Sequence, residues 1–169
     1  MTRLASVSRF VGILCAFIFI SRAHSQSVAL SLCPVGNPGN SPDATVSGTS
    51  YGAVAYTYDI GKFDITLTQY VAFLNAVASK ADPYKLYNSG VAYSNTSFSV
   101  LSEQPGIIQT GGPGAFVYTV VGDGQEPVTF VNWFAAARFC NWLHNGEPET
   151  AGESAGSTET GAYTLAGDT

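Results

Sequence analysis

Apolar residues recur at helical spacing along one face of the stretch that follows Thr66. Gln69 stands three residues after Thr66, which matches the capping box that begins many helices. A proline disfavours helical backbone angles at the residue before it, so the helix should end before Asp82 and Pro83. The pattern predicts an amphipathic helix over about Leu67–Ser79. Its apolar face comprises Leu67, Tyr70, Val71, Leu74, Val77 and Ala78.

A second helix is expected over Trp133–His144. Asn132 is a suitable N-cap, and Gly146 stands just past the end, where glycine favours helix termination. An apolar stripe runs along this helix, and we expect it to pack into the core, with Trp133 and Cys140 buried. The stripe comprises Trp133, Ala136, Ala137, Cys140 and Leu143.

Short strands and long loops fill the rest of the chain. Residues 84–110 are rich in Tyr, Asn, Ser and Gly, a composition that predicts irregular structure. The composition of Glu147–Gly161 predicts a solvated acidic loop of low complexity. Tyr163–Leu165 has the composition of the start of a strand. Two amphipathic helices with a few short antiparallel strands predict a loop-rich α+β domain. The expected strands are Val28–Val35, Ala53–Ile60, Phe63–Ile65 and Phe116–Val121.

The first 25 residues have the layout of a secretory signal peptide. Two arginines precede the apolar run Phe10–Ile20, and Ala23-His24-Ser25 places small residues before a cut ahead of Gln26. The alternative is an uncleaved N-terminal anchor, although the apolar run is shorter than the roughly 20 residues that span a bilayer. We expect residues 1–25 to be removed and residues 26–169 to form one secreted or periplasmic domain.

The charge balance limits the classes of partner. The 169-residue chain has 7 Lys+Arg and 12 Asp+Glu, for a net charge of −5. Signal cleavage would remove three arginines and no acid, which leaves a mature charge of −8. Such a chain lacks the basic footprint that nucleic acids require, and anionic membrane surfaces would repel it. We therefore expect no nucleic-acid partner and no membrane association after cleavage.

Candidate catalytic and metal-binding groups are sparse. No hydrolase, zinc-protease or nucleotide-binding motif is present, and after cleavage two cysteines, Cys33 and Cys140, remain. Their separation fits no zinc motif, and the sequence leaves their pairing open. Cys140 and His144 are four residues apart on one helix, a spacing that could activate a thiol nucleophile. We favour the core interpretation of Cys140 and assign no catalytic, cofactor-binding or metal-binding residue.

Two ordered blocks of residues resemble a known family. The chain is similar to the sulfatase-modifying-factor domain, the family of the formylglycine-generating enzymes, in its secreted bacterial branch. The resemblance covers roughly residues 28–169, and its second block resembles that family's "PV-x-x-VSW-x-DA-x-x-(Y/F)C-x-W" helix. The family's aspartate in this helix is Ala135 here, which weakens the helix N-terminus but removes no chemistry. The matching segments are Val35–Asn40, Gly52–Tyr56, Ile60–Thr66, Gln69–Ala78, Pro127–Trp142 and Thr158–Leu165.

The resemblance implies a fold, an activity and a partner. The family fold is a C-type-lectin-like α+β domain, and its enzymes use copper and oxygen to oxidise a sulfatase cysteine to formylglycine. The cysteine pair that binds copper belongs to the family's C-terminal half, which has no counterpart here, and Cys140 matches a structural position. We therefore expect an incomplete, inactive domain with an exposed apolar patch, and a sulfatase or another secreted protein as its partner.

The alternative function is a non-catalytic, lectin-like binding or structural module. Such a module would bind carbohydrate or protein through exposed aromatic side chains. The candidates are Tyr84, Tyr87, Tyr93 and Trp142.

Overall fold

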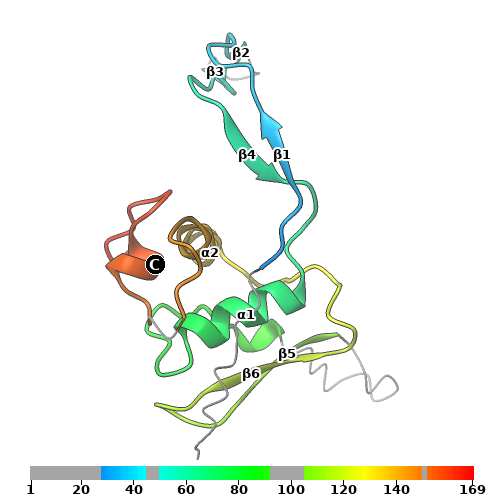
Figure 1. Ribbon diagram of the computed structural model, residues 1–169, viewed down its shortest axis with the longest axis vertical. Helices are drawn as coiled ribbons and strands as arrows, with labels where there is room; N and C mark the ends of the chain where they lie inside the picture. The colour runs from blue at the N-terminus through cyan, green and yellow to red at the C-terminus, as the bar shows by residue number, and fades with distance from the viewer. Residues whose placement is uncertain (1–27, 45–49, 92–104, 150–151) are drawn as a thin grey trace, which may run out of the picture.

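The computed structural model describes residues 28–44, 50–91, 105–149 and 152–169 (Figure 1). The expected signal peptide and Tyr93 lie outside these residues. No helix in the described ranges is long and apolar enough to cross a membrane. The elements are β1 (Leu32–Val35), β2 (Asp43–Ala44), β3 (Ser50–Tyr51), β4 (Tyr58–Gly61), α1 (Leu67–Val77), the 3₁₀-helix η1 (Ser89–Val91), β5 (Gly106–Thr110), β6 (Val117–Val121), α2 (Trp133–His144) and the π-helix η2 (Ala155–Glu159).

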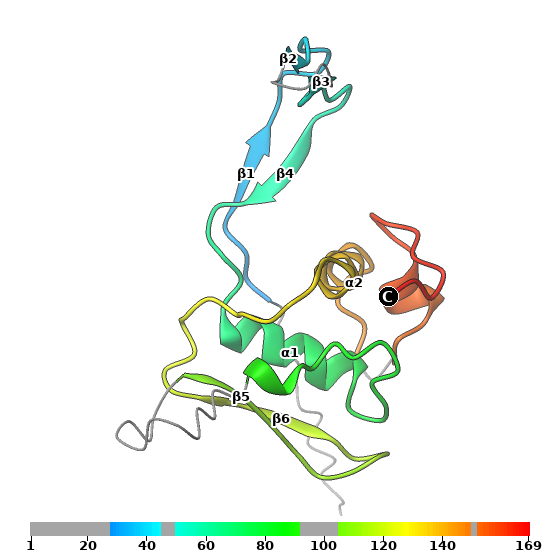
Figure 2. The same cartoon turned by 180° about the vertical axis from the view of Figure 1, so that it is seen from behind.

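Helix α1 lies at the centre of the body, with α2 on one side and the β5–β6 hairpin on the other (Figures 1 and 2). The β1–β4 hairpin rises away from this body, and the C-terminal residues lie beside α2 (Figure 1). The described strands form three separate antiparallel pairs, β1–β4, β2–β3 and β5–β6. The expected α+β class is therefore confirmed.

Aromatic side chains fill the space between the two helices. Phe73 and Trp142 are both fully buried, and their ring centroids are 5.4 Å apart. Phe139 packs edge-on against Phe73 at 5.3 Å, and the Tyr70 ring lies 5.5 Å from the Phe73 ring. Aromatic pairs at such distances add to the free energy gained from burying their area. This cluster holds α2 against α1.

The expected capping box of α1 is present. Thr66 Oγ1 accepts the Gln69 amide at 3.3 Å, and Gln69 Oε1 accepts the Thr66 amide at 2.9 Å. Further along the helix, the Asn75 side chain donates to the Tyr118 carbonyl at 2.9 Å and accepts the Tyr118 amide at 3.0 Å. One polar side chain thus satisfies both backbone groups of a residue in β6 and fixes the hairpin beneath the helix.

The segment before α2 returns across the start of α1. The Thr68 amide donates to the Gly124 carbonyl, and a bridge pairs Thr66 with Pro127. Gly124 has a φ of 77°, and a Cβ there would collide with the Thr68 hydroxyl. Glycine is required at this crossing because only its backbone can approach the helix so closely.

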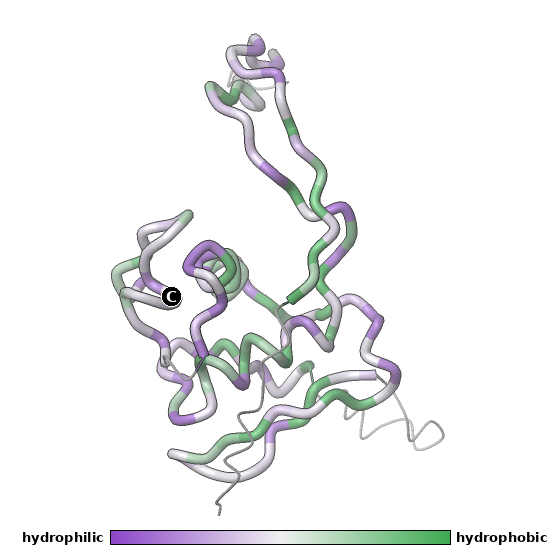
Figure 3. The backbone as a smooth tube through the Cα atoms, viewed as in Figure 1, coloured by the Kyte–Doolittle hydropathy of each residue, from purple (hydrophilic) through white to green (hydrophobic). Residues whose placement is uncertain are grey.

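The β1–β4 hairpin and the described residues around it form an arm, residues 28–44 and 50–61 (Figure 1). Figure 3 shows apolar positions along the arm, and many of their side chains are exposed. The expected strands Val28–Val35 and Ala53–Ile60 overlap β1 and β4, but they begin four and five residues too early. The expectation of a strand at Phe63–Ile65 is wrong, because these residues bend from the arm into α1. The exposed apolar positions of the arm include Leu32, Val35, Tyr51, Tyr56, Tyr58 and Ile60.

Three further expectations, for segments outside the two main helices, are wrong in whole or in part. Residues 84–110 are not irregular throughout, because they contain η1 and β5. Glu147–Gly161 is not wholly a solvated loop, since it contains η2, and Glu159 is buried at the end of that helix. Tyr163–Leu165 forms no strand. Helix α2 matches its expected bounds, with Asn132 as the N-cap.

Candidate functional site

A groove of about 650 Å³ separates the base of the arm from α2. This volume lies within the range of sites that bind small molecules or peptide side chains. The floor comes from the core, with Tyr70 of α1 and Phe139 of α2. The lining is mainly apolar, so the groove exposes surface that water solvates poorly. The lining residues are Leu30, Leu32, Asp59, Gly61, Phe63, Asp64, Ile65, Tyr70, Val128, Val131, Ala136, Phe139, Cys140, Leu143, His144 and Ala162.

The wall that α2 contributes includes Ala136, Cys140 and Leu143 from the stripe that the sequence assigned to the core, whereas Trp133 and Ala137 do not line the groove. Trp133 is 61% exposed, and Ala136 and Cys140 are also exposed, so the expectation that Trp133 and Cys140 are buried is wrong. The helix packs on α1 through the neighbouring face, which carries Phe139 and Trp142. Helix α2 therefore carries two apolar faces, and part of the second one borders the groove.

Two hydrogen bonds tie the base of the arm to the body. The Val28 amide donates to Glu147 Oε2 at 2.6 Å, and Gln69 Nε2 donates to the Ala29 carbonyl at 2.8 Å. A third bond, from the Lys62 amide to the Ser31 carbonyl at 2.8 Å, continues the pairing of β1 with β4 and joins the two sides of the arm at its base. The first two contacts hold the arm base against α1 and against Glu147, three residues past the end of α2.

A second hollow continues around the arm base and shares Leu30, Phe63 and Asp64 with the groove. Its volume is about 450 Å³, and its lining is more polar. The two hollows thus adjoin at these three residues, and the first is the more apolar of the two. The residues that belong to the second hollow alone are Ala29, Ser31, Thr66, Gln69, Gln125 and Pro127.

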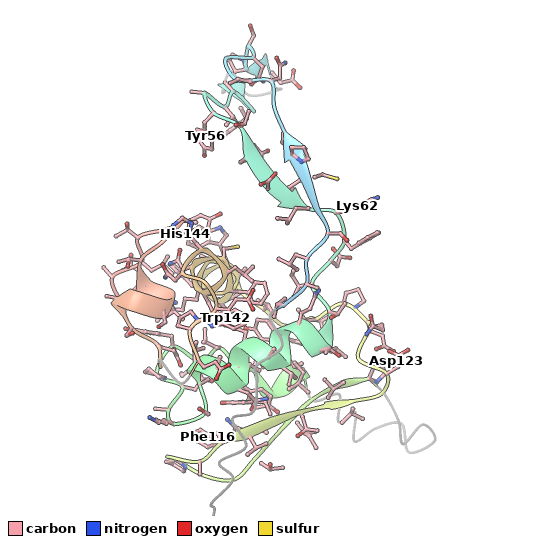
Figure 4. The ribbon with its side chains drawn as sticks, viewed as in Figure 1. Tyr56, Lys62, Phe116, Asp123, Trp142 and His144 are labelled. Atoms are coloured by element: carbon pink, nitrogen blue, oxygen red, sulfur yellow. The ribbon has the colours of Figure 1, made fainter. Side chains whose placement is uncertain are left out.

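The charged groups of the groove are mainly acidic. Asp59 and Asp64 line it from the arm side, and both are exposed. His144 lies at the opposite rim, on the side of α2 away from α1, whereas Trp142 points between the helices (Figure 4). The lining holds two carboxylates and no lysine or arginine, so the groove presents negative charge to a ligand.

Cys140 and His144 both line the groove, but no hydrogen bond joins their side chains in the described structure. Partial burial raises the pKa of the Cys140 thiol, which is the opposite of what a nucleophile needs. The arrangement offers no support for a thiol enzyme. Cys33 lies on β1, and both cysteines are free thiols, which answers the open question of their pairing.

A buried ion pair joins α2 to the C-terminal segment, residues 152–169. Arg138 is fully buried, and its Nε and Nη2 donate to the two carboxylate oxygens of Glu159 at 2.6 and 2.9 Å. Nη2 also donates to the Asp168 carbonyl at 2.9 Å, and the Tyr84 ring lies over the guanidinium at 3.9 Å. Burial alone would raise the pKa of Glu159, but hydrogen bonds from Arg138 and Gly167 outweigh it and lower that pKa.

Asn141 and Glu153 add to this attachment. Asn141 Nδ2 donates to the carbonyls of Thr158 and Tyr163, and its Oδ1 accepts the Tyr163 amide at 2.8 Å. Burial, together with the nearby Asp82 carboxylate, raises the pKa of Glu153 to about 8. Sequence reasoning missed these residues. The available signal was an arginine and an asparagine at positions 138 and 141, three residues apart within an apolar helix.

The aromatic residues proposed for ligand binding are mostly engaged elsewhere. Trp142 is fully buried, so its expected exposure is wrong, and its indole donates to the Pro148 carbonyl at 3.2 Å. Tyr84 is half-buried against Arg138, and the hydroxyl of the half-buried Tyr87 donates to the Ile107 carbonyl at 3.2 Å. These side chains do not form a common platform.

The residues present do not fit the copper that the family resemblance implies. In the described ranges, no three His, Cys, Asp or Glu side chains gather into a group that could hold a metal ion. Cys33 and Cys140 belong to separate elements.

Comparisons with known proteins identified no relative of this chain. No protein family, no curated protein and no solved structure matches the chain.

Proposed function

We propose that this chain is a non-catalytic binding module that holds an apolar segment of another protein in the groove between the arm and α2. One observation carries the proposal. The exposed stripe of α2, with Ala136 and Cys140, faces the apolar arm base across a space of about 650 Å³. Covering this surface would release water from both walls, which is the main driving force of protein association.

A polypeptide segment suits the site better than a carbohydrate does. The described aromatic side chains that were candidates for stacking on sugar rings are engaged within the protein, as Trp142 and Tyr84 illustrate. The two hollows share three residues and succeed one another around the arm base. An extended chain rises about 3.3 Å per residue and alternates its side chains, so it can occupy successive hollows.

The resemblance to the sulfatase-modifying-factor family supplies the context of this proposal. If the chain is related to this family, its fold is of the C-type-lectin-like type, the protein is exported, and its partner is a sulfatase or another exported protein. The resemblance also carries a catalytic alternative, the oxidation of a substrate cysteine to formylglycine. Mass spectrometry of a sulfatase-derived cysteine peptide, incubated with the protein, copper and oxygen, should find the peptide unmodified. A mass loss that matches the aldehyde, above a control without protein, would favour the catalytic alternative.

Filling the groove tests the binding function. We expect a fluorescent peptide of alternating leucine and serine to bind the protein in an anisotropy titration. Ala136→Trp places a large side chain in the groove at an exposed helix position, and it should weaken binding by at least about tenfold. Ala81→Trp, at an exposed loop position outside the groove, serves as the matched control. Failure of the peptide to bind, or equal binding by both variants, would contradict the proposed function.

A further inference from the structure

We propose that the segment bound in the groove is cationic, with a lysine or arginine between its apolar side chains. This inference rests on the proposed function and adds the chemical class of the partner. It follows from the placement of two carboxylates, Asp59 and Asp64, on the arm side of the groove.

Both carboxylates are available to a ligand. Asp59 lies in β4 and Asp64 in the bend that leads to α1, and both are exposed. Neither forms an ion pair with another described residue. Lys62 stands between them in the sequence, but its ammonium lies over the Phe63 ring, 5.6 Å from the centroid, and its side chain points away from α2 (Figure 4). The groove thus keeps its negative charge.

Asp64 lines both the apolar groove and the more polar second hollow. A chain that buries apolar side chains beside α2 and continues into the second hollow brings an intervening side chain to Asp64. A lysine or arginine there would pair with the carboxylate, while its aliphatic stem packs on Leu30 and Phe63.

The other charges of the chain also favour a cationic ligand. No lysine or arginine lines either hollow. The whole chain has a net charge of −5, so its long-range field attracts cationic segments and repels anionic ones. Specificity for a basic segment would therefore combine local pairing at Asp64 with general steering.

Three peptides distinguish these contributions. The alternating leucine–serine peptide is compared with versions in which lysine or glutamate replaces serine. We expect the lysine peptide to bind most tightly and the glutamate peptide most weakly. Asp64→Asn should reduce the preference for lysine over serine by roughly threefold, and the Asp59→Asn/Asp64→Asn double variant by up to about tenfold. Asp43→Asn removes the same charge at the far end of the arm and should leave the preference nearly unchanged.

The outcomes separate the inference from the proposed function. If all three peptides bind equally and Ala136→Trp abolishes their binding, the groove is a binding site but the cationic preference is wrong. If the lysine peptide binds equally well to Ala136→Trp, or if Asp43→Asn matches Asp64→Asn, non-specific attraction explains the preference and the inference falls. If no peptide binds, both the inference and the proposed function fall.

Discussion

The arm and the C-terminal segment both extend beyond the helical body, but they are held in different ways. The arm carries large apolar side chains such as Tyr58 and Ile60, and these remain exposed. The C-terminal segment is rich in glycine, serine and threonine, yet Glu159 and Leu165 are buried. The arm is tied to the body mainly at its base, whereas the C-terminal segment is bonded to α2 along much of its length.

This difference shows that apolar composition is a poor guide to burial in this protein. Buried polar side chains of α2, Arg138 and Asn141, hold the C-terminal segment through directed hydrogen bonds. A two-stranded hairpin such as the arm has too little surface of its own to bury its apolar residues. These residues are therefore left exposed, and the ones at the arm base form one wall of the groove.

The largest expected effect comes from breaking the buried ion pair. Arg138→Met should lower the free energy of unfolding by about 3–5 kcal/mol, because Glu159 would be left buried without its partner. Urea unfolding followed by circular dichroism measures the change. The double variant Arg138→Met/Glu159→Leu removes both charges and should recover most of the loss. A loss below about 1 kcal/mol for Arg138→Met would show that the C-terminal segment does not depend on this pair.

A smaller effect is expected from the titration of Glu153. Its pKa of about 8 in the folded protein exceeds its ordinary value of 4.5, so between these values the folded state holds a proton that the unfolded state has released. Stability should therefore decrease as the pH rises from about 4.5 to about 8. Asp82 and Arg138 are the charged groups that act on this carboxyl, and the Tyr84 amide donates to it.

Glu153→Gln isolates this contribution. The amide keeps an acceptor for the Tyr84 amide but cannot ionise, so thermal melts across pH 5–8 should show a flatter profile than the parent protein. Glu159 has the opposite effect on the pH dependence of stability. Its pKa is lowered in the folded protein, so the stability that it contributes is lost as the pH falls through that pKa. An unchanged slope in Glu153→Gln would show that this carboxyl is not protonated in the folded state.

The smallest effect is expected in the arm. Ile60→Ser changes a side chain that is 52% exposed, so the free energy of unfolding should change by less than about 0.5 kcal/mol. Leu74→Ala, at a fully buried position of α1, should cost about 2–5 kcal/mol in the same urea titration. Comparable losses for the two variants would mean that the arm packs on the body in solution.

The helices could be predicted from the sequence because their signals are local. Thr66 and Gln69 specify the start of α1, and Asn132 specifies the start of α2. The orientation of α2 could not be predicted in the same way. Its twelve residues carry two apolar faces, one with Trp133 and Cys140 and one with Phe139 and Trp142, and periodicity alone ranks neither first.

The candidate site depends on contacts that no local pattern records. Its walls come from segments as distant as Leu30 and Ala162. Arg138 and Glu159 are 21 positions apart in the sequence, and Glu159 belongs to a segment whose composition predicts a solvated loop. Such pairings are decided by the tertiary arrangement, so the sequence could indicate the chemistry of individual residues but not the groove that they form.

Alkylation of the Cys140 and Cys33 thiols tests the central claim most directly. Cys140 lines the groove, whereas Cys33 lies on β1 and is not among the lining residues, so one protein carries both the probe and its control. Iodoacetamide labelling is followed by mass spectrometry with and without the leucine–lysine peptide. The peptide should slow alkylation of Cys140 in proportion to its occupancy and leave the rate at Cys33 unchanged. Equal rates at Cys140 with and without saturating peptide would contradict the assignment of the groove as the binding site.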